Sequence, residues 1–260
     1  MGQILQLANL RAYTRGQQQG TLPQWPIAEM LYQRVPVLAY RNYLNNDNKN
    51  QWPLCWEARR IIPALELAGN ILKGWQAFRP FSSREVIRAL APKLPRIILQ
   101  LQDALQSHSV DYVTCLAPTG RKSAEILVQM AHAVSSIARA KQVRNPMLGS
   151  KILGFFFPDF FPIWDTAWVK KALARREVNN LPHEVRSRLR GDEAGLEYAR
   201  YVHLMVSDAW NTSHKEYERL RRECIRQCKR YSYAPDHVID EYFNDLTPVI
   251  FEACLLGSLR

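Results

Sequence analysis

The sequence lacks any long apolar run. No stretch of the 260-residue chain holds the roughly eighteen consecutive apolar residues that a membrane-spanning helix needs. The opening residues, MGQILQLANLRAYTRGQQQG, turn polar too soon for the apolar region of a signal peptide, and Gln6 stands where a myristoylation signal has Ser or Thr. These absences predict a cytoplasmic protein without a membrane partner.

Cysteine is also scarce, with five residues at scattered positions: Cys55, Cys115, Cys224, Cys228 and Cys254. An odd number of dispersed cysteines is typical of reduced thiols rather than of a disulfide framework. Cys224 and Cys228 are one helical turn apart, but a structural zinc site needs four ligands at recognisable spacings. We therefore expect these two cysteines to be small core residues and expect no metal site.

Several catalytic motifs are missing. The chain contains no Walker A loop, no GxGxxG, no GxSxG and no HExxH pattern. Their absence disfavours nucleotide hydrolysis, dinucleotide-dependent redox chemistry, serine-hydrolase chemistry and zinc peptidase activity. The sequence therefore predicts no cofactor.

Acidic residues are few relative to basic ones, with 24 Asp and Glu against 35 Lys and Arg and a formal charge of +11. A charge of this size attracts polyanions. Nucleic acid is the expected partner, DNA before RNA, and the sequence names no protein partner. Anionic membranes are a weaker alternative, because the chain has no separate basic amphipathic tail.

The hydrophobic residues, 47% of the chain, follow a helical period almost everywhere. We predict an all-α fold and a single domain over 1–260, with two lobes around a cleft as a variant and a lobe boundary near 107–120. Ser82 and Glu85 have capping-box spacing, as do Ser213 and Glu216. The expected helices cover 55–78 with a kink or break at Pro63, then 82–91, 96–106, 121–143, a short one from Ser150, 166–175, 193–210, 213–230 and 236–256.

Residues 145–173 carry the densest chemical signal, with Lys151 and Asp165 set among five phenylalanines and two tryptophans. Lys151 follows a Gly-Ser turn at the start of an apolar helix, where the helix dipole and apolar neighbours lower a lysine pKa. Asp165 precedes the next expected helix and suits its N-cap. Either Asp165 caps that helix and Lys151 extends out of the core, or the two side chains face one cleft.

The order glycine, lysine, apolar helix, Pro-apolar stretch and aspartate resembles the core of the helix-hairpin-helix base-excision DNA glycosylases. The resemblance covers about thirty residues, with 148–151 as the hairpin end and 161–165 as the aspartate stretch. It implies a hairpin at Gly149 and Ser150 that grips a DNA phosphate. It further implies that Lys151 forms a Schiff base and that Asp165 stabilises the developing positive charge.

A base that is to be excised from a duplex must first be flipped into a pocket, where aromatic side chains stack on it. If the chemistry is retained, the candidates to line that pocket are Phe161, Trp164 and Trp168. Core packing is the alternative role for at least two of them, because aromatic residues bury large areas. A divergent member of the family that recognises DNA without removing a base fits the same residues.

Three groups of basic residues are candidates for phosphate contact. Arg121 and Lys122 stand at an expected helix N-terminus, where backbone amides bind anions. The second group follows Asp165 on the next helix and comprises Lys170, Lys171 and Arg175. The third comprises Arg219, Arg222 and Arg226, whose spacing of three and four places them on one helix face. A solvated face with intrahelical ion pairs is the alternative for the third group.

Two functions therefore stay open. The first is a DNA-binding protein that resembles the base-excision glycosylases of DNA repair and removes or recognises a flipped base. The second is a non-enzymatic, basic, helical nucleic-acid-binding or adaptor protein of a defence or mobile-element system. The geometry of Lys151 and Asp165 is the observation that separates them.

Overall fold

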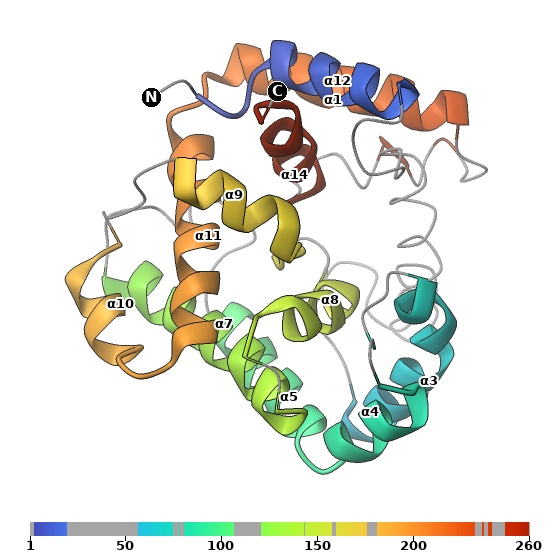
Figure 1. Cartoon of the computed structure of the whole chain (residues 1–260), viewed down its shortest axis with the longest axis vertical. Helices are drawn as coiled ribbons and strands as arrows, with labels where there is room; N and C mark the ends of the chain where they lie inside the picture. Colours follow the sequence, from blue (N-terminus) through green and yellow to red (C-terminus); the bar gives the residue numbers. More distant parts are fainter. Residues whose placement is uncertain are drawn as a thin grey trace.

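The computed structural model describes residues 3–19, 57–74, 78, 81–106, 121–142, 144–157, 160–175, 181–231, 236, 239–240 and 248–259. Every element within these ranges is a helix, which confirms the predicted all-α fold (Figure 1). The lobe boundary expected near 107–120 lies outside the described residues. The helices are α1 (Leu7–Gln18), α3 (Ala58–Gly74), α4 (Ser83–Leu90), α5 (Leu94–Gln106), α7 (Arg121–Ala140), α8 (Met147–Phe156), α9 (Thr166–Arg175), α10 (His183–Arg188), α11 (Glu193–Trp210), α12 (His214–Tyr231) and α14 (Pro248–Gly257).

Helix α4 begins at the predicted capping box. Ser82 Oγ accepts a hydrogen bond from the Glu85 amide at 3.3 Å, and Glu85 Oε2 accepts one from the Ser82 amide at 2.7 Å. The two bonds satisfy amide donors that the first turn of a helix leaves unpaired. Val86 and Leu90, four residues apart, turn the buried face of the helix towards the core.

Helix α7 is the central scaffold of the fold, with α8, α10 and α11 packed on it. The apolar stripe predicted from the sequence is buried along its length, at Ile126, Met130, Val134 and Ile137. Helix α11 crosses α7 near one end and rises to the top layer (Figure 1). These apolar residues at helical spacing thus form a buried face of α7, and polar residues such as Glu125 and Arg139 lie on its exposed side.

The top layer consists of α1, α12 and α14, and it brings the two ends of the chain together (Figure 1). Helices α1 and α12 run in the same direction. At their starts the Leu7 amide donates to Glu216, and about two to three turns later Gln227 of α12 contacts Thr14 of α1. Helix α14 lies beneath α1, and a Cβ at Gly257 would collide with the backbone of Asn9. A glycine is required at that crossing.

Two expected boundaries are wrong. Pro63 lies inside α3, which continues to Gly74, so of the kink or break expected there the break does not occur. Helix α8 begins at Met147, three residues before the expected start at Ser150, and Pro146 precedes it. None of the described helices is long and apolar enough to cross a membrane.

Candidate functional site

The segment that links α8 to α9 passes through the centre of the molecule. Its peptide groups are bonded to side chains from three other elements: the Ile163 amide to Glu252 Oε1 at 2.5 Å, the Trp164 amide to Ser150 Oγ at 2.9 Å, and the Pro162 carbonyl to Tyr198 Oη at 3.0 Å. A buried backbone needs such partners. These three bonds hold the sequence before Asp165 at a fixed depth between α8, α11 and α14.

The predicted turn at Gly149 and Ser150 is absent. Both residues lie inside α8 and are buried. A Cβ at Gly149 would collide with the carbonyl oxygen of Val134 in α7, so the glycine serves a close helix contact. The Ser150 hydroxyl donates a hydrogen bond to the Met147 carbonyl and accepts one from the Trp164 amide. The phosphate role that the resemblance implies for these two residues is therefore wrong, since it requires an exposed hairpin.

Lys151 is the one charged residue of α8, and 8% of its surface is exposed. Burial lowers the pKa of its ammonium group, and the negative charge of Asp165 opposes that effect by raising it. Burial is the larger effect because removing a charge from water costs more than one partly solvated partner returns. The structure thus brings the two predicted site residues within electrostatic reach, with the lowered lysine pKa that the sequence predicted.

Asp165 is the N-cap of α9. Its Oδ1 accepts hydrogen bonds from the amides of Ala167 at 3.0 Å and Trp168 at 3.1 Å. This confirms the capping prediction. While it caps the helix, the carboxylate also raises the pKa of Lys151. The same side chain satisfies a helix start and counters a buried positive charge.

The aromatic residues predicted to line a base pocket separate into two kinds. Phe161 and Trp164 are fully buried: Phe161 stacks on Tyr198 with ring centroids 6.2 Å apart, and Trp164 packs edge-on against Tyr201 at 5.8 Å. Their rings already have aromatic neighbours, as the core alternative expected. Trp168 is half-buried, and Lys171 Nζ lies 5.9 Å from its ring centroid.

Two polar atoms that flank Asp165 in the sequence were not anticipated. Trp164 Nε1 and Thr166 Oγ1 are buried, and neither has a hydrogen-bond partner among the described residues. A buried polar group without a partner costs about 1–3 kcal/mol. These two residues stand on either side of Asp165 in the sequence, so the donors and acceptors of this segment are not all satisfied within the described residues.

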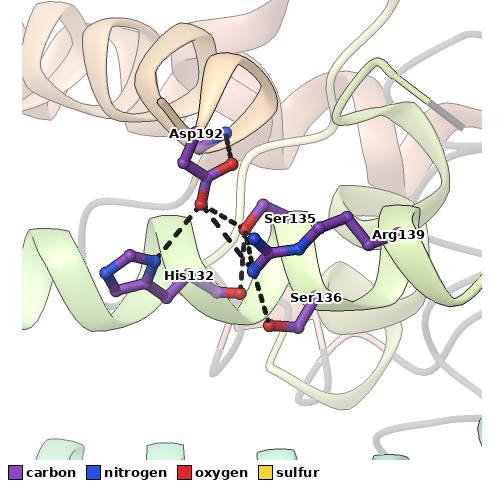
Figure 2. A network of polar contacts seen from close by, with 6 residues as sticks. His132, Ser135, Ser136, Arg139 and Asp192 are labelled. Carbon is purple, nitrogen blue, oxygen red and sulfur yellow. Dashed lines mark hydrogen bonds and ion pairs between the residues drawn. The ribbon is translucent and has the colours of Figure 1, made fainter. Parts of the chain in front are cut away.

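A second polar network, which sequence reasoning missed, joins α7 to the start of α11 (Figure 2). Asp192 Oδ2 accepts a hydrogen bond from Ser135 Oγ at 2.6 Å and lies 3.2 Å from His132 Nδ1 and 4.0 Å from Arg139 Nη2. Its other oxygen caps α11 by accepting from the Gly195 amide at 3.1 Å. The helical spacing of 132, 135 and 139 was the available signal.

These residue types are those of a serine-type catalytic triad, but their order in space is different. In a triad the serine hydroxyl bonds to histidine, and the aspartate orients that histidine from the far side. Here Asp192 lies between them, and Ser135 donates to the carboxylate. Ser135 is also fully buried. The network therefore holds two helices together and does not activate a nucleophile.

Helix α12 carries the strongest charge pattern on the described surface. Six exposed cations fall within about 100° of its circumference at 3.6 residues per turn, and we call them the cationic stripe: Lys215, Arg219, Arg222, Arg226, Lys229 and Arg230. Leu220 and Cys224 turn the opposite side of the helix into the core. The predicted common face of Arg219, Arg222 and Arg226 is thus exposed.

Ion pairs offset part of the stripe, both within the helix and from Asp240 and Asp236, which lie 2.9 and 3.4 Å from Lys229 Nζ. Arg219 lies 3.4 Å from Glu216, and Arg226 lies 2.6 Å from Glu223. Both arginines are at least half exposed, and exposed pairs of this kind are worth only about 0.3–0.5 kcal/mol. Within the described part of the chain, Lys215 and Arg222 form no ion pair.

Helix α1 adds charge beside the stripe. Arg11 and Arg15 are both exposed on α1, which runs alongside α12 (Figure 1). The pKa of Glu223 is lowered mainly by its hydrogen bond from Arg226, and the charge of Arg11 contributes to that shift. Cations from two adjacent helices therefore act on the same carboxylate.

The remaining predicted phosphate contacts are less concentrated. Lys170 is exposed and lies 3.5 Å from Glu197, while Lys171 is exposed beside Trp168. Arg121 begins α7, but its side chain and those of Lys122 and Arg175 lie outside the described residues. No group of His, Cys, Asp or Glu within the described ranges could hold a metal ion.

Comparison with known proteins gives no match to the chain, whether to a protein family, to a curated protein or to a solved structure.

Proposed function

We propose that the protein binds DNA through its phosphate backbone, with the cationic stripe of α12 as the main contact. The observation that carries the proposal is the gathering of six exposed cations on one face of a single helix. Arg11 and Arg15 of the parallel α1 widen the same positive surface. The excess of 35 basic over 24 acidic residues supports a polyanion as the partner.

The dimensions suit a nucleic-acid strand. From Lys215 to Arg230 the stripe extends about 22 Å at 1.5 Å per residue. One strand of duplex DNA presents a phosphate about every 3.4 Å along the helix axis. Because each strand also winds around the duplex, a straight stripe of this length meets phosphates of both strands, which together present about thirteen over that length.

The ion pairs of α12 do not prevent this binding. Releasing Arg226 from Glu223 costs about 0.3–0.5 kcal/mol, because the arginine is 69% exposed and the pair is screened by water. Each phosphate that a cation neutralises releases a condensed counterion, which favours binding at low salt. Contact with DNA is therefore expected to replace the intrahelical pairs.

The proposal is tested by a charge-matched comparison on blunt duplex DNA at low salt. The variant R219Q/R222Q/R226Q removes three charges from the stripe, and the control R84Q/R88Q/R96Q removes three exposed charges from α4 and α5. We expect the first to bind about tenfold or more weakly and the second to bind like the wild type. Equal loss in both would mean that net charge alone drives binding; no wild-type binding would refute the proposal.

A second candidate function is base excision at Lys151, which the lowered pKa of Lys151 beside Asp165 favours. A lysine whose pKa is lowered has a larger neutral fraction, and the neutral amine is the nucleophile that forms a Schiff base with a sugar aldehyde. The described residues around Lys151 lie in a continuous helix and do not form the hairpin that the glycosylase resemblance implies. This candidate therefore depends on the Lys151–Asp165 pair alone.

Reduction with borohydride in the presence of abasic and damaged DNA tests the second candidate. A covalent adduct is expected with the wild type and not with Lys151→Ala, while Lys151→Met shows whether the amine rather than the buried volume is needed. Adduct formation that persists in both variants would place the nucleophile elsewhere. Binding without any adduct on a broad lesion panel would leave the non-enzymatic binding function.

A further inference from the structure

Trp210 is a large hydrophobic side chain on the surface of the described part of the chain, with 53% of its area exposed. It is the last residue of α11. A single exposed hydrophobic residue needs no explanation by itself. Its position does, because the cationic stripe begins at Lys215, five residues further along.

The corner between α11 and α12 holds Trp210 in a fixed place. The amides of Asn211 and Thr212 donate to the carbonyls of Ser207 and Ala209 at 3.2 and 3.1 Å. Thr212 Oγ1 donates to the Asp208 carbonyl at 2.7 Å. Every bond closes the last turn of α11, so the backbone that carries Trp210 is held in the corner where α11 leads into α12.

The Asp208 side chain reinforces this corner from the other end of the chain. Its two carboxylate oxygens accept hydrogen bonds from the amides of Ile4 and Leu5 at 2.7 and 2.6 Å. Gln3 donates from Nε2 to Thr212 Oγ1 at 2.7 Å. The N-terminal segment thus ties the support of Trp210 to the layer that carries Arg11 and the stripe.

An exposed aromatic ring that precedes a line of cations by five residues is a combination that suits the binding of unpaired bases. The cations follow the phosphates, and the ring stacks on a base whatever its identity, with about 1–3 kcal/mol per base. A base inside a duplex cannot stack on such a ring, because its faces are covered by its neighbours. A base can do so where a duplex gives way to single strand.

We propose that Trp210 stacks on an unpaired base at the end of the backbone that the cationic stripe holds, so that the preferred ligand is DNA with a junction between duplex and single strand. This inference rests on the proposed DNA binding. It adds a substrate class that the charge pattern alone does not specify. Trp210 determines the preference for the junction, and the stripe supplies the general affinity.

The test compares blunt duplex DNA with a duplex of equal length that carries a short single-stranded overhang. We expect the wild type to bind the overhang DNA about fivefold or more tightly. Trp210→Ala should lose this preference and keep the affinity for blunt duplex, whereas Trp210→Phe should retain most of it. An unchanged unfolding midpoint in Trp210→Ala shows that the fold is intact.

The outcomes separate the two proposals. Wild-type binding to both DNAs with equal affinity, or a preference that survives in Trp210→Ala, would overturn the role of Trp210 and leave duplex binding standing. Absence of wild-type binding to either DNA at low salt would overturn both. A salt dependence that is the same for Trp210→Ala and the wild type is also expected, because the substitution removes no charge.

Discussion

Gly149 of α8 lies directly against the backbone of Val134 in α7, and a Cβ at position 149 would be 2.8 Å from the Val134 Cα and would collide with its carbonyl oxygen. This contact sets the separation of the two helices. It also fixes the depth of Lys151, two residues along α8. A glycine that looks like part of a turn in the sequence is thus a contact point between helices.

Gly149→Ala is expected to lower the free energy of unfolding by about 2 kcal/mol, because the methyl group meets backbone atoms that cannot rotate away. Gly69→Ala in α3 is the matched control: a Cβ there meets nothing within 4 Å. It should raise stability by up to about 1 kcal/mol through helix propensity. Urea unfolding measures both, and a gain in stability for Gly149→Ala would contradict the close contact.

Lys151→Met is expected to raise the free energy of unfolding at pH 7 by about 1 kcal/mol or more, since it replaces a buried ammonium group with an apolar chain of similar length. Burial holds the pKa of Lys151 in the fold below its ordinary value of 10.5. Between the lowered pKa and 10.5 the unfolded chain binds more protons, so this residue makes the wild type more stable as the pH rises.

The pH series distinguishes this cause from a packing effect. Measured from about pH 7 to about pH 10, the stability difference between Lys151→Met and the wild type should shrink as the pH rises through that window. Titration of other groups is common to both proteins and cancels in the difference. A difference that stays constant over the range would show that burial does not perturb Lys151.

Asp165→Asn is expected to lower the pKa of Lys151 further, because it removes the negative charge that raises it. Asparagine caps a helix about as well as aspartate, so α9 should keep its start. The window in which stability rises with pH should therefore extend to lower pH in this variant. If the pH profile of Asp165→Asn matches that of the wild type, Asp165 is a helix cap and nothing more.

Asp192→Ala is expected to destabilise the fold by about 2 kcal/mol, because it removes the cap of α11 and leaves the buried Ser135 hydroxyl without its carboxylate partner. In a double-mutant cycle, Asp192→Ala and Ser135→Ala should couple by about 1 kcal/mol. Ser136→Ala, which meets the network through Arg139 Nη2 at 3.4 Å and not through Asp192 directly, should couple less strongly to Asp192. Additive effects at 135 and 192 would indicate that the bond contributes nothing.

The features that the sequence predicted correctly are those set by neighbours along the chain. The capping box of Ser82 and Glu85 and the N-cap role of Asp165 depend on residues two or three positions away. The apolar stripe of α7 depends on a period of a few residues. Local hydrogen bonds and side-chain periodicity determine such features, so a single sequence is enough to find them.

The features that the sequence missed depend on contacts between distant segments. Ser213 and Glu216 have capping-box spacing, and the Glu216 amide does donate to Ser213 Oγ. The Glu216 side chain, however, accepts from the amide of Leu7 at 2.8 Å. Asp192 likewise finds Ser135 across two helices. The helical spacing of 132, 135 and 139 indicates a shared polar face, but it does not indicate that Asp192 is the partner, because tertiary packing brings that residue to it.

The glycosylase resemblance illustrates the same division. Asp165 does cap the start of a helix, as the aspartate stretch suggested. No hairpin forms at Gly149, because that residue lies inside α8 and packs against α7. The rings of Phe161 and Trp164 pack against Tyr198 and Tyr201 in the core and are not exposed to a base. We propose that the exposed face of α12, and not a hairpin at Gly149, contacts the phosphates.

The salt dependence of duplex DNA binding tests whether the cationic stripe of α12 contacts the phosphates. For the wild type, the logarithm of the binding constant should fall with the logarithm of the salt concentration with a slope of about −4 to −6, as expected for five or six neutralised phosphates. In R219Q/R222Q/R226Q the slope should be shallower by about 3, and in R84Q/R88Q/R96Q it should be unchanged. A slope near zero for the wild type, or one that the stripe variant leaves unaltered, would contradict backbone binding by α12.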